Sequence, residues 1–193
     1  MTETEKSPQT PQSNEPEVMK SLALGIVGDM GRFLKDEGLG REPVKILEMI
    51  VFAMFVVTEA FITIKKGVDQ AQESLDLFHE EMTEYIFMEY FYKDQRAQDV
   101  EELKARFTEL QTMVNLRYQE YRQAFHEDYQ DLEKGFRRTF IALSDHLFQE
   151  APPEGEERDR LIAVFSVKLA HFWSGVMSSF EPGTEQKPPS GSA

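Results

Sequence analysis

The sequence predicts an all-α protein: a helical bundle with a four-helix head and a long, antiparallel, coiled-coil-like stalk of two helices. Apolar side chains recur every three to four residues through most of the chain, which is the spacing of one helix face. No stretch alternates apolar and polar side chains for long enough to indicate a strand. From Val68 to Lys134 there is neither glycine nor proline, so the residues that most often interrupt a helix do not occur there.

Two polar tails flank the expected helical domain. Residues 1–17 are rich in Glu, Ser, Pro, Thr and Gln, and residues 181–193 have a similar composition. Neither tail carries enough large apolar side chains to offset the entropy lost on ordering, so we expect both to be disordered. Residues 18–180 are then a single all-helical domain. The N-terminus also lacks the basic and apolar regions of a secretory signal.

The first helix is expected at about residues 17–35, where apolar residues follow the helical period: Val18, Leu22, Ile26, Met30 and Phe33. Glycines weaken this helix, because each costs about 1 kcal/mol relative to alanine. They occupy every third position, a spacing that suits close packing against another backbone: Gly25, Gly28 and Gly31. A loop follows, and Pro43 is well placed in the first turn of the next helix.

Two long helices are expected next, over residues 44–93 and 99–149, with bends allowed at Gly67 and Gly135. Each would be about 75 Å long. A reversal at residues 94–98 would pair them so that facing residue numbers sum to about 192, which places Met82 opposite Leu110. A last helix, about 156–180, would join the first helix in covering the apolar end of this hairpin and so complete the head.

The segment 44–66 could be a membrane span or a bundle helix. Its apolar run is about 29 Å long, the thickness of a hydrocarbon core. However, Glu48 and Glu59 fall on one helix face, and a carboxylate in mid-span costs about 2.5–3.5 kcal/mol. We therefore expect three sides of the helix to be covered by protein and this polar stripe to lie at the surface, with Glu59 near Lys134, Arg137 or Arg138. A transmembrane helix over 44–66, with an inner-membrane location, is the alternative.

Composition argues against several chemistries. The chain has no cysteine, which excludes disulfides and thiolate sites, and its net charge of −14 argues against nucleic acid as a partner. Around the four histidines, only Asp76 to His79 approaches the Glu-x-x-His pattern of di-iron bundles, so no metal or other cofactor is predicted. No nucleophile motif or phosphate loop is present, so no catalytic residue is predicted. Arg117 and Arg122 alternate with acidic residues, which predicts a solvated helix face.

An aromatic segment near the expected reversal predicts an interaction patch. A two-helix stalk buries only one stripe, so about half of this segment would be exposed, as is typical of protein-binding surfaces. The predicted patch consists of Tyr85, Phe87, Met88, Tyr90, Phe91 and Tyr92. It would contact a partner protein, a second copy of the chain, or both.

The predicted function follows from this patch. We expect a non-enzymatic, cytoplasmic helical protein that acts through protein–protein contacts, as an adaptor, regulator or assembly component. Membrane association through residues 44–66 is one alternative. The other is a small-molecule- or lipid-binding bundle with an aromatic cavity lined by Phe52, Phe55, Phe136, Phe140 and Trp173.

Overall fold

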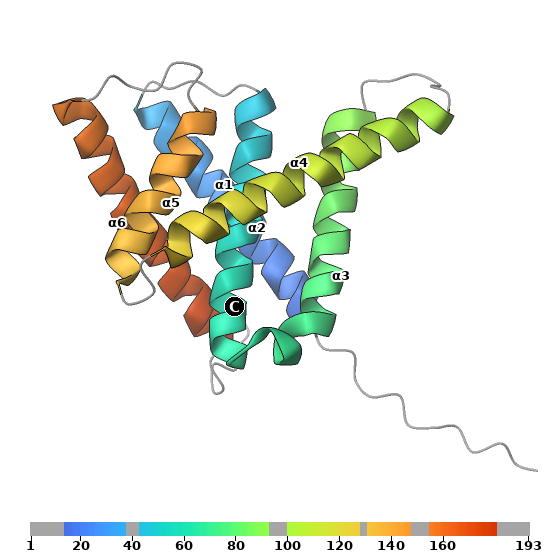
Figure 1. Ribbon diagram of the computed structural model, residues 1–193, viewed down its shortest axis with the longest axis horizontal. Helices are drawn as coiled ribbons and strands as arrows, with labels where there is room; N and C mark the ends of the chain where they lie inside the picture. The colour runs from blue at the N-terminus through green and yellow to red at the C-terminus, as the bar shows by residue number, and fades with distance from the viewer. Residues whose placement is uncertain (1–13, 38–42, 93–99, 128–130, 148–154, 181–193) are drawn as a thin grey trace, which may run out of the picture.

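A computed structural model describes residues 14–37, 43–92, 100–127, 131–147 and 155–180. Every element in these ranges is helical (Figure 1), which confirms the all-α class for the described chain. The elements are α1 (Glu15–Asp36), α2 (Pro43–Lys65), α3 (Val68–Ile86), the π-helical turn η1 (Phe87–Tyr92), α4 (Val100–His126), α5 (Leu132–Leu147) and α6 (Glu156–Phe180). Residues 1–13 and 181–193, most of the two predicted tails, lie outside the described residues.

Helix α1 buries three residues of its predicted stripe, Ile26, Met30 and Phe33, whereas Val18 and Leu22 are half-buried. Proline in its first turn and the acidic residues Glu15 and Glu17 suit a helix N-terminus. The glycine stripe behaves differently from the expectation. A Cβ atom at Gly25, Gly28 or Gly31 would meet no atom of another described element within 4 Å, so these glycines do not serve close packing against the described part of the chain.

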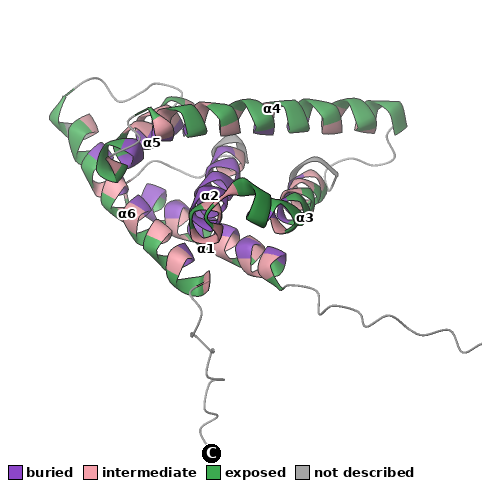
Figure 2. Ribbon diagram, turned by 60° about the horizontal axis from the view of Figure 1, so that its bottom comes forward, coloured by how far each residue is buried: buried purple, intermediate pink, exposed green. Residues whose placement is uncertain are grey.

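Helix α2 lies at the centre of the molecule and packs against α1, α3, α4, α5 and α6 (Figures 1 and 2). Every residue from Glu48 to Phe61 is buried. The expectation of a surface-exposed fourth side is therefore wrong, because α4 crosses that side. The long apolar run reflects burial on all sides by protein.

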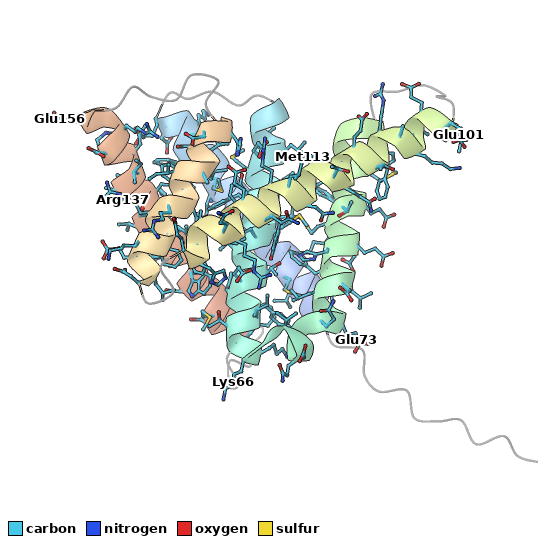
Figure 3. All side chains as sticks on the ribbon, in the orientation of Figure 1. Lys66, Glu73, Glu101, Met113, Arg137 and Glu156 are labelled. Atoms are coloured by element: carbon cyan, nitrogen blue, oxygen red, sulfur yellow. The ribbon has the colours of Figure 1, made fainter. Side chains whose placement is uncertain are left out.

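The predicted continuous helix over 44–93 is also wrong, because the chain reverses after α2. Lys66 has φ 61° and Gly67 has φ 150°, and the latter is a conformation that glycine adopts far more readily than other residues. Figure 3 shows Lys66 at this turn. Helix α3 then packs back on both α1 and α2, through the buried residues Ala71, Leu75, Phe78, Met82 and Ile86.

The second predicted long helix, 99–149, is likewise two helices, because α4 and α5 pack against each other. Asp131 begins α5, where its carboxylate accepts a hydrogen bond from the backbone N–H of Lys134 at 3.2 Å. Gly135 does not bend a helix. A Cβ atom there would lie 2.8 Å from the carbonyl oxygen of Phe125, so glycine lets α5 approach the end of α4 closely. Two helical hairpins thus replace the two uninterrupted helices from which the stalk was predicted.

Candidate functional site

The predicted interaction patch lies where α3 passes into η1. Tyr85 and Phe87 are half-buried, and Met88 is 44% exposed. The backbone from Phe87 to Tyr92 is π-helical, a conformation that often occurs at functional sites. The side chains of Tyr90, Phe91 and Tyr92 lie outside the described residues.

A groove of about 720 Å³ runs beside this patch, between α3 and the outer half of α4. Phe87 and Phe107 meet edge to face at one end, with ring centroids 5.3 Å apart. The apolar lining consists of these two rings and Val114, and the carboxylates of Glu80 and Glu84 are exposed on the α3 side. No lysine or arginine is among the described residues that line the groove. The lining is therefore apolar at Phe87, Phe107 and Val114, acidic at the exposed Glu80 and Glu84, and otherwise polar and uncharged.

His79 anchors the groove to the core. Its Nε2 atom lies 3.0 Å from the hydroxyl of Thr58 on α2, and its ring meets that of Tyr118 on α4, with centroids 5.7 Å apart. Burial lowers the pKa of His79, and nearby Asp76 only partly opposes this effect. His79 thus joins α2, α3 and α4 in its neutral form.

The buried carboxylate of Glu48 is held by two residues of α4. Arg117 donates through Nε to both carboxylate oxygens, at 3.1 Å each, and the Tyr121 hydroxyl donates to one of them at 3.4 Å. Burial and the charge of Glu48 raise the pKa of Tyr121 well above its usual range. Glu120 extends the network, because its carboxylate lies 3.6 Å from Arg117 and 2.8 Å from Nε2 of His146 on α5.

Glu59 is bound by a second pair of α4 residues. Its two carboxylate oxygens lie 3.3 Å from Nε of Arg122 and 2.9 Å from Nε2 of His126. The expectation that Glu59 pairs with Lys134, Arg137 or Arg138 is wrong, because that register assumed uninterrupted helices. Lys134 pairs with Asp131, which directly precedes α5, Arg137 pairs with Asp159 on α6, and Arg138 pairs with Glu127.

These carboxylates are placed for structure. Glu48 and Glu59 are eleven residues apart on α2, which is about 16 Å along the helix axis, too far for paired acid–base chemistry. Each forms an ion pair with an arginine of α4, Glu48 with Arg117 and Glu59 with Arg122. Among the described residues, no group of three or more His, Cys, Asp or Glu side chains could hold a metal ion.

The aromatic residues predicted to line a ligand cavity pack against other rings. Phe52 contacts Phe55 and Tyr121, with centroids 6.4 and 5.5 Å away, and Phe140 stacks on Phe165 at 4.1 Å. Phe136 and Trp173 are 5.6 Å apart. These contacts form part of the core between α2, α4, α5 and α6.

Sequence reasoning missed the partners of the two buried carboxylates. Arg117 with Tyr121, and Arg122 with His126, are both pairs spaced by four residues on one helix, so each pair presents its polar groups together. This repeated spacing was the available signal. The acidic residues that alternate with these two arginines obscured the signal, because they suggested a solvated helix face.

No protein-family model, curated protein or solved structure matches this chain in the three comparisons.

Proposed function

We propose that this protein acts by binding a partner protein, as an adaptor, regulator or assembly component, and that the groove between α3 and α4 receives a basic amphipathic helix of that partner. The carrying observation is the groove itself, with the apolar Phe87, Phe107 and Val114 and the exposed Glu80 and Glu84 in its lining. Grooves of this kind bind amphipathic helices by burying their apolar face.

Charge selects the class of partner. The chain carries a net charge of −14, and the groove adds two carboxylates without a basic lining residue among those described. An acidic partner would be repelled, and a basic one would be attracted and oriented. The adjacent π-helical turn exposes Met88, and methionine side chains adapt to differently shaped partners.

The proposal includes two further points: α2 is buried by protein and does not contact lipid, and the protein is located in the cytoplasm. Two helices are long and apolar enough to cross a membrane by length and composition, over Ile46–Lys65 and Arg158–Phe180. The first of these windows is 78% buried within the protein, which supports its role as a core helix. Membrane association through residues 44–66 is the alternative, and sedimentation with vesicles of phosphatidylcholine and phosphatidylglycerol would favour it.

The test uses a synthetic fourteen-residue helical peptide of leucine and lysine, with all leucines on one face, titrated by fluorescence anisotropy. We expect the Glu80→Gln/Glu84→Gln variant to bind it about fivefold to tenfold more weakly than the unsubstituted protein, from the loss of two charges in the groove lining. The control is Asp69→Asn/Glu73→Gln, which has the same net charge and changes exposed residues in the first turns of α3 that do not line the groove. Figure 3 shows Glu73 near the start of this helix. Equal weakening in both variants, or no binding by the unsubstituted protein, would contradict the proposal.

A further inference from the structure

One imidazole ring lies in the wall of the α3–α4 groove. His79 is the only histidine among the described residues that line this groove, and it is half-buried. Its ring is set among aromatic rings, with the centroids of Phe78 and Tyr118 at 5.4 and 5.7 Å. A molecule bound in the groove would therefore cover the part of this ring that water still reaches.

The polar contact of His79 suits a neutral ring. Its Nε2 atom lies 3.0 Å from the hydroxyl of Thr58, and a hydroxyl can donate to an imidazole nitrogen or accept from its N–H. On its own helix, the charge of Asp76 favours the protonated ring, but that carboxylate also accepts a hydrogen bond from Gln72 at 2.8 Å. Burial has the larger effect, so the pKa of His79 is lowered.

The titratable groups of the other packed helices do not offer His79 a counter-ion. On α2, the carboxylate of Glu59 is held by Arg122 and His126 of α4, at 3.3 and 2.9 Å. On α4, Tyr118 faces the ring of His79, and burial raises the pKa of this tyrosine well above its usual range. Within the described chain, His126 thus has a carboxylate at ion-pair distance and His79 has none.

A basic helix in the groove would act on His79 in three ways, all of the same sign. It would remove water from the ring, which disfavours the charged form. Its lysines would repel a protonated ring. They would also offset the negative charge of Glu80 and Glu84, which line the same groove as His79. Protonation of His79 and binding of the helix therefore oppose each other.

From this geometry we propose that His79 makes binding in the α3–α4 groove depend on pH: the neutral ring admits the basic amphipathic helix, and protonation of the ring weakens its binding. The inference rests on the proposed function of the groove and adds a means of regulating it. Because the coupling is reciprocal, the bound helix must disfavour protonation by the same factor by which protonation weakens binding. Acidification would then release the partner.

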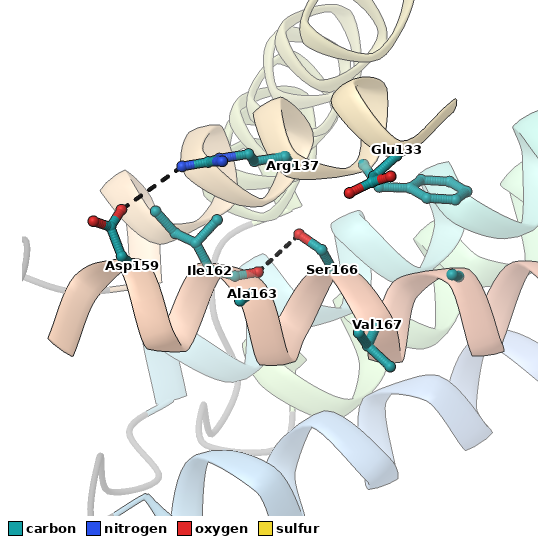
Figure 4. A pocket seen from close by; sticks show the side chains of 9 residues that line it. Glu133, Arg137, Asp159, Ile162, Ala163, Ser166 and Val167 are labelled. Carbon is teal, nitrogen blue, oxygen red and sulfur yellow. Dashed lines mark hydrogen bonds and ion pairs between the residues drawn. The ribbon is translucent and has the colours of Figure 1, made fainter. Parts of the chain in front are cut away.

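A second groove, between α5 and α6, provides a contrast within the same molecule. It holds about 600 Å³, and Phe136 and Ile162 are among its lining residues. Arg137 and Asp159 form an ion pair there at 3.7 Å (Figure 4). No histidine is among the described residues that line it. Binding of a peptide in this second groove would therefore not respond to a substitution of His79.

The test measures binding of the leucine–lysine peptide to the full chain by fluorescence anisotropy at pH 7.5 and pH 5.0. Lysine keeps its charge over this range. We expect Kd to rise at pH 5.0 by at least about twofold more in the unsubstituted protein than in His79→Gln. The upper bound is about thirtyfold, because the pKa of His79 lies below its usual 6.5. The control is His171→Gln, at an exposed position of α6, which should retain the full pH effect.

A titration followed by nuclear magnetic resonance tests the reciprocal effect without a substitution in the protein that is measured. The chain has only four histidines, so the ring signal of His79 is identified by its absence from the spectrum of His79→Gln. Saturating peptide should lower the pKa of His79 in the unsubstituted protein. A merely structural role for His79 would not produce this change.

The outcomes separate the regulation from the groove itself. Binding at pH 7.5 that is equal or stronger at pH 5.0 would overturn the regulation and leave the groove proposal standing. An equal loss of affinity in His79→Gln would do the same, since the carboxylates would then carry the effect, and so would a pKa of His79 that the peptide leaves unchanged. Absence of binding at both pH values would contradict the groove proposal and the regulation with it.

Discussion

Helices α2 and α6 are both long and apolar, yet the protein uses them in different ways. The apolar window of α2 is 78% buried and that of α6 is 33% buried. Helix α2 is surrounded by five helices, whereas α6 contacts α2, α5 and α1 and leaves Ala163, Val167 and His171 exposed on its outward face. Apolar composition alone therefore does not distinguish a core helix from a helix that leaves one face exposed.

The largest expected difference between the two helices is in the cost of removing a side chain. Phe52→Ala in α2 should lower the free energy of unfolding by about 3–5 kcal/mol, because Phe52 is fully buried among other rings. Val167→Ala in α6 should change it by less than about 0.5 kcal/mol, because Val167 is 71% exposed. Urea denaturation measures both values, and similar losses would contradict the comparison.

The buried ion pairs of α2 give the next largest effect. Glu48→Gln should cost about 2–3 kcal/mol, because Arg117 would keep its charge beside a neutral, buried side chain. Glu101→Gln on the exposed part of α4 is the control and should cost less than about 0.5 kcal/mol, although Glu101 also pairs with a basic residue, Lys104. A double-mutant cycle of Glu48→Gln with Arg117→Met should give a coupling energy of about 1–3 kcal/mol, and its absence would show that the pair is not stabilising.

Two glycines extend the contrast between interior and surface. Gly135→Ala should cost about 1–3 kcal/mol, because the new methyl group would collide with the backbone of Phe125. Gly175→Ala on α6 should instead stabilise the protein by about 0.5–1 kcal/mol, because no atom of another described element lies within 4 Å of the added carbon. Thermal unfolding followed by circular dichroism checks the signs, and destabilisation by both changes would contradict this contrast.

The smallest effect concerns the pH dependence of stability at the α2–α3 contact. Burial lowers the pKa of folded His79 below its unfolded value, so the unfolded chain binds the extra proton first. The contribution of His79 to the free energy of unfolding is fully present above its pKa in the unfolded chain, near 6.5. This contribution decreases as the pH falls toward the lower pKa of the folded protein. Denaturation from pH 7.5 to 5 should therefore show a smaller decrease in stability for His79→Gln than for the unsubstituted protein. Equal slopes would argue against a neutral, buried His79.

Periodicity was enough to predict the all-α class and the buried part of the α1 stripe, because one helix face is visible in local spacing. It was not enough for the topology. A glycine at position 67 is compatible with a bent helix and with a full reversal of the chain. Only the backbone conformation, with φ 150° at Gly67, distinguishes the two. Helix α4 ends at His126 and α5 begins at Leu132, and neither glycine nor proline lies between these two residues in the sequence to mark the break.

The partners of Glu48 and Glu59 depended on that topology. Once α4 is free to cross α2, Arg117 and Arg122 reach the carboxylates, and the predicted stripe becomes an internal network. The α5–α6 groove also escaped prediction, because its lining comes from two helices whose relative placement is not visible in local spacing.

Thiol labelling gives the most direct test of the contrast between α2 and α6, because the chain has no cysteine of its own. Single-cysteine variants Val56→Cys, at a buried site of α2, and Val167→Cys, on the exposed face of α6, would be treated with a water-soluble maleimide without detergent. In dilute protein we predict labelling on the order of a thousandfold faster at position 167, because position 56 reacts only after unfolding. Comparable rates at the two positions in dilute protein would contradict the account.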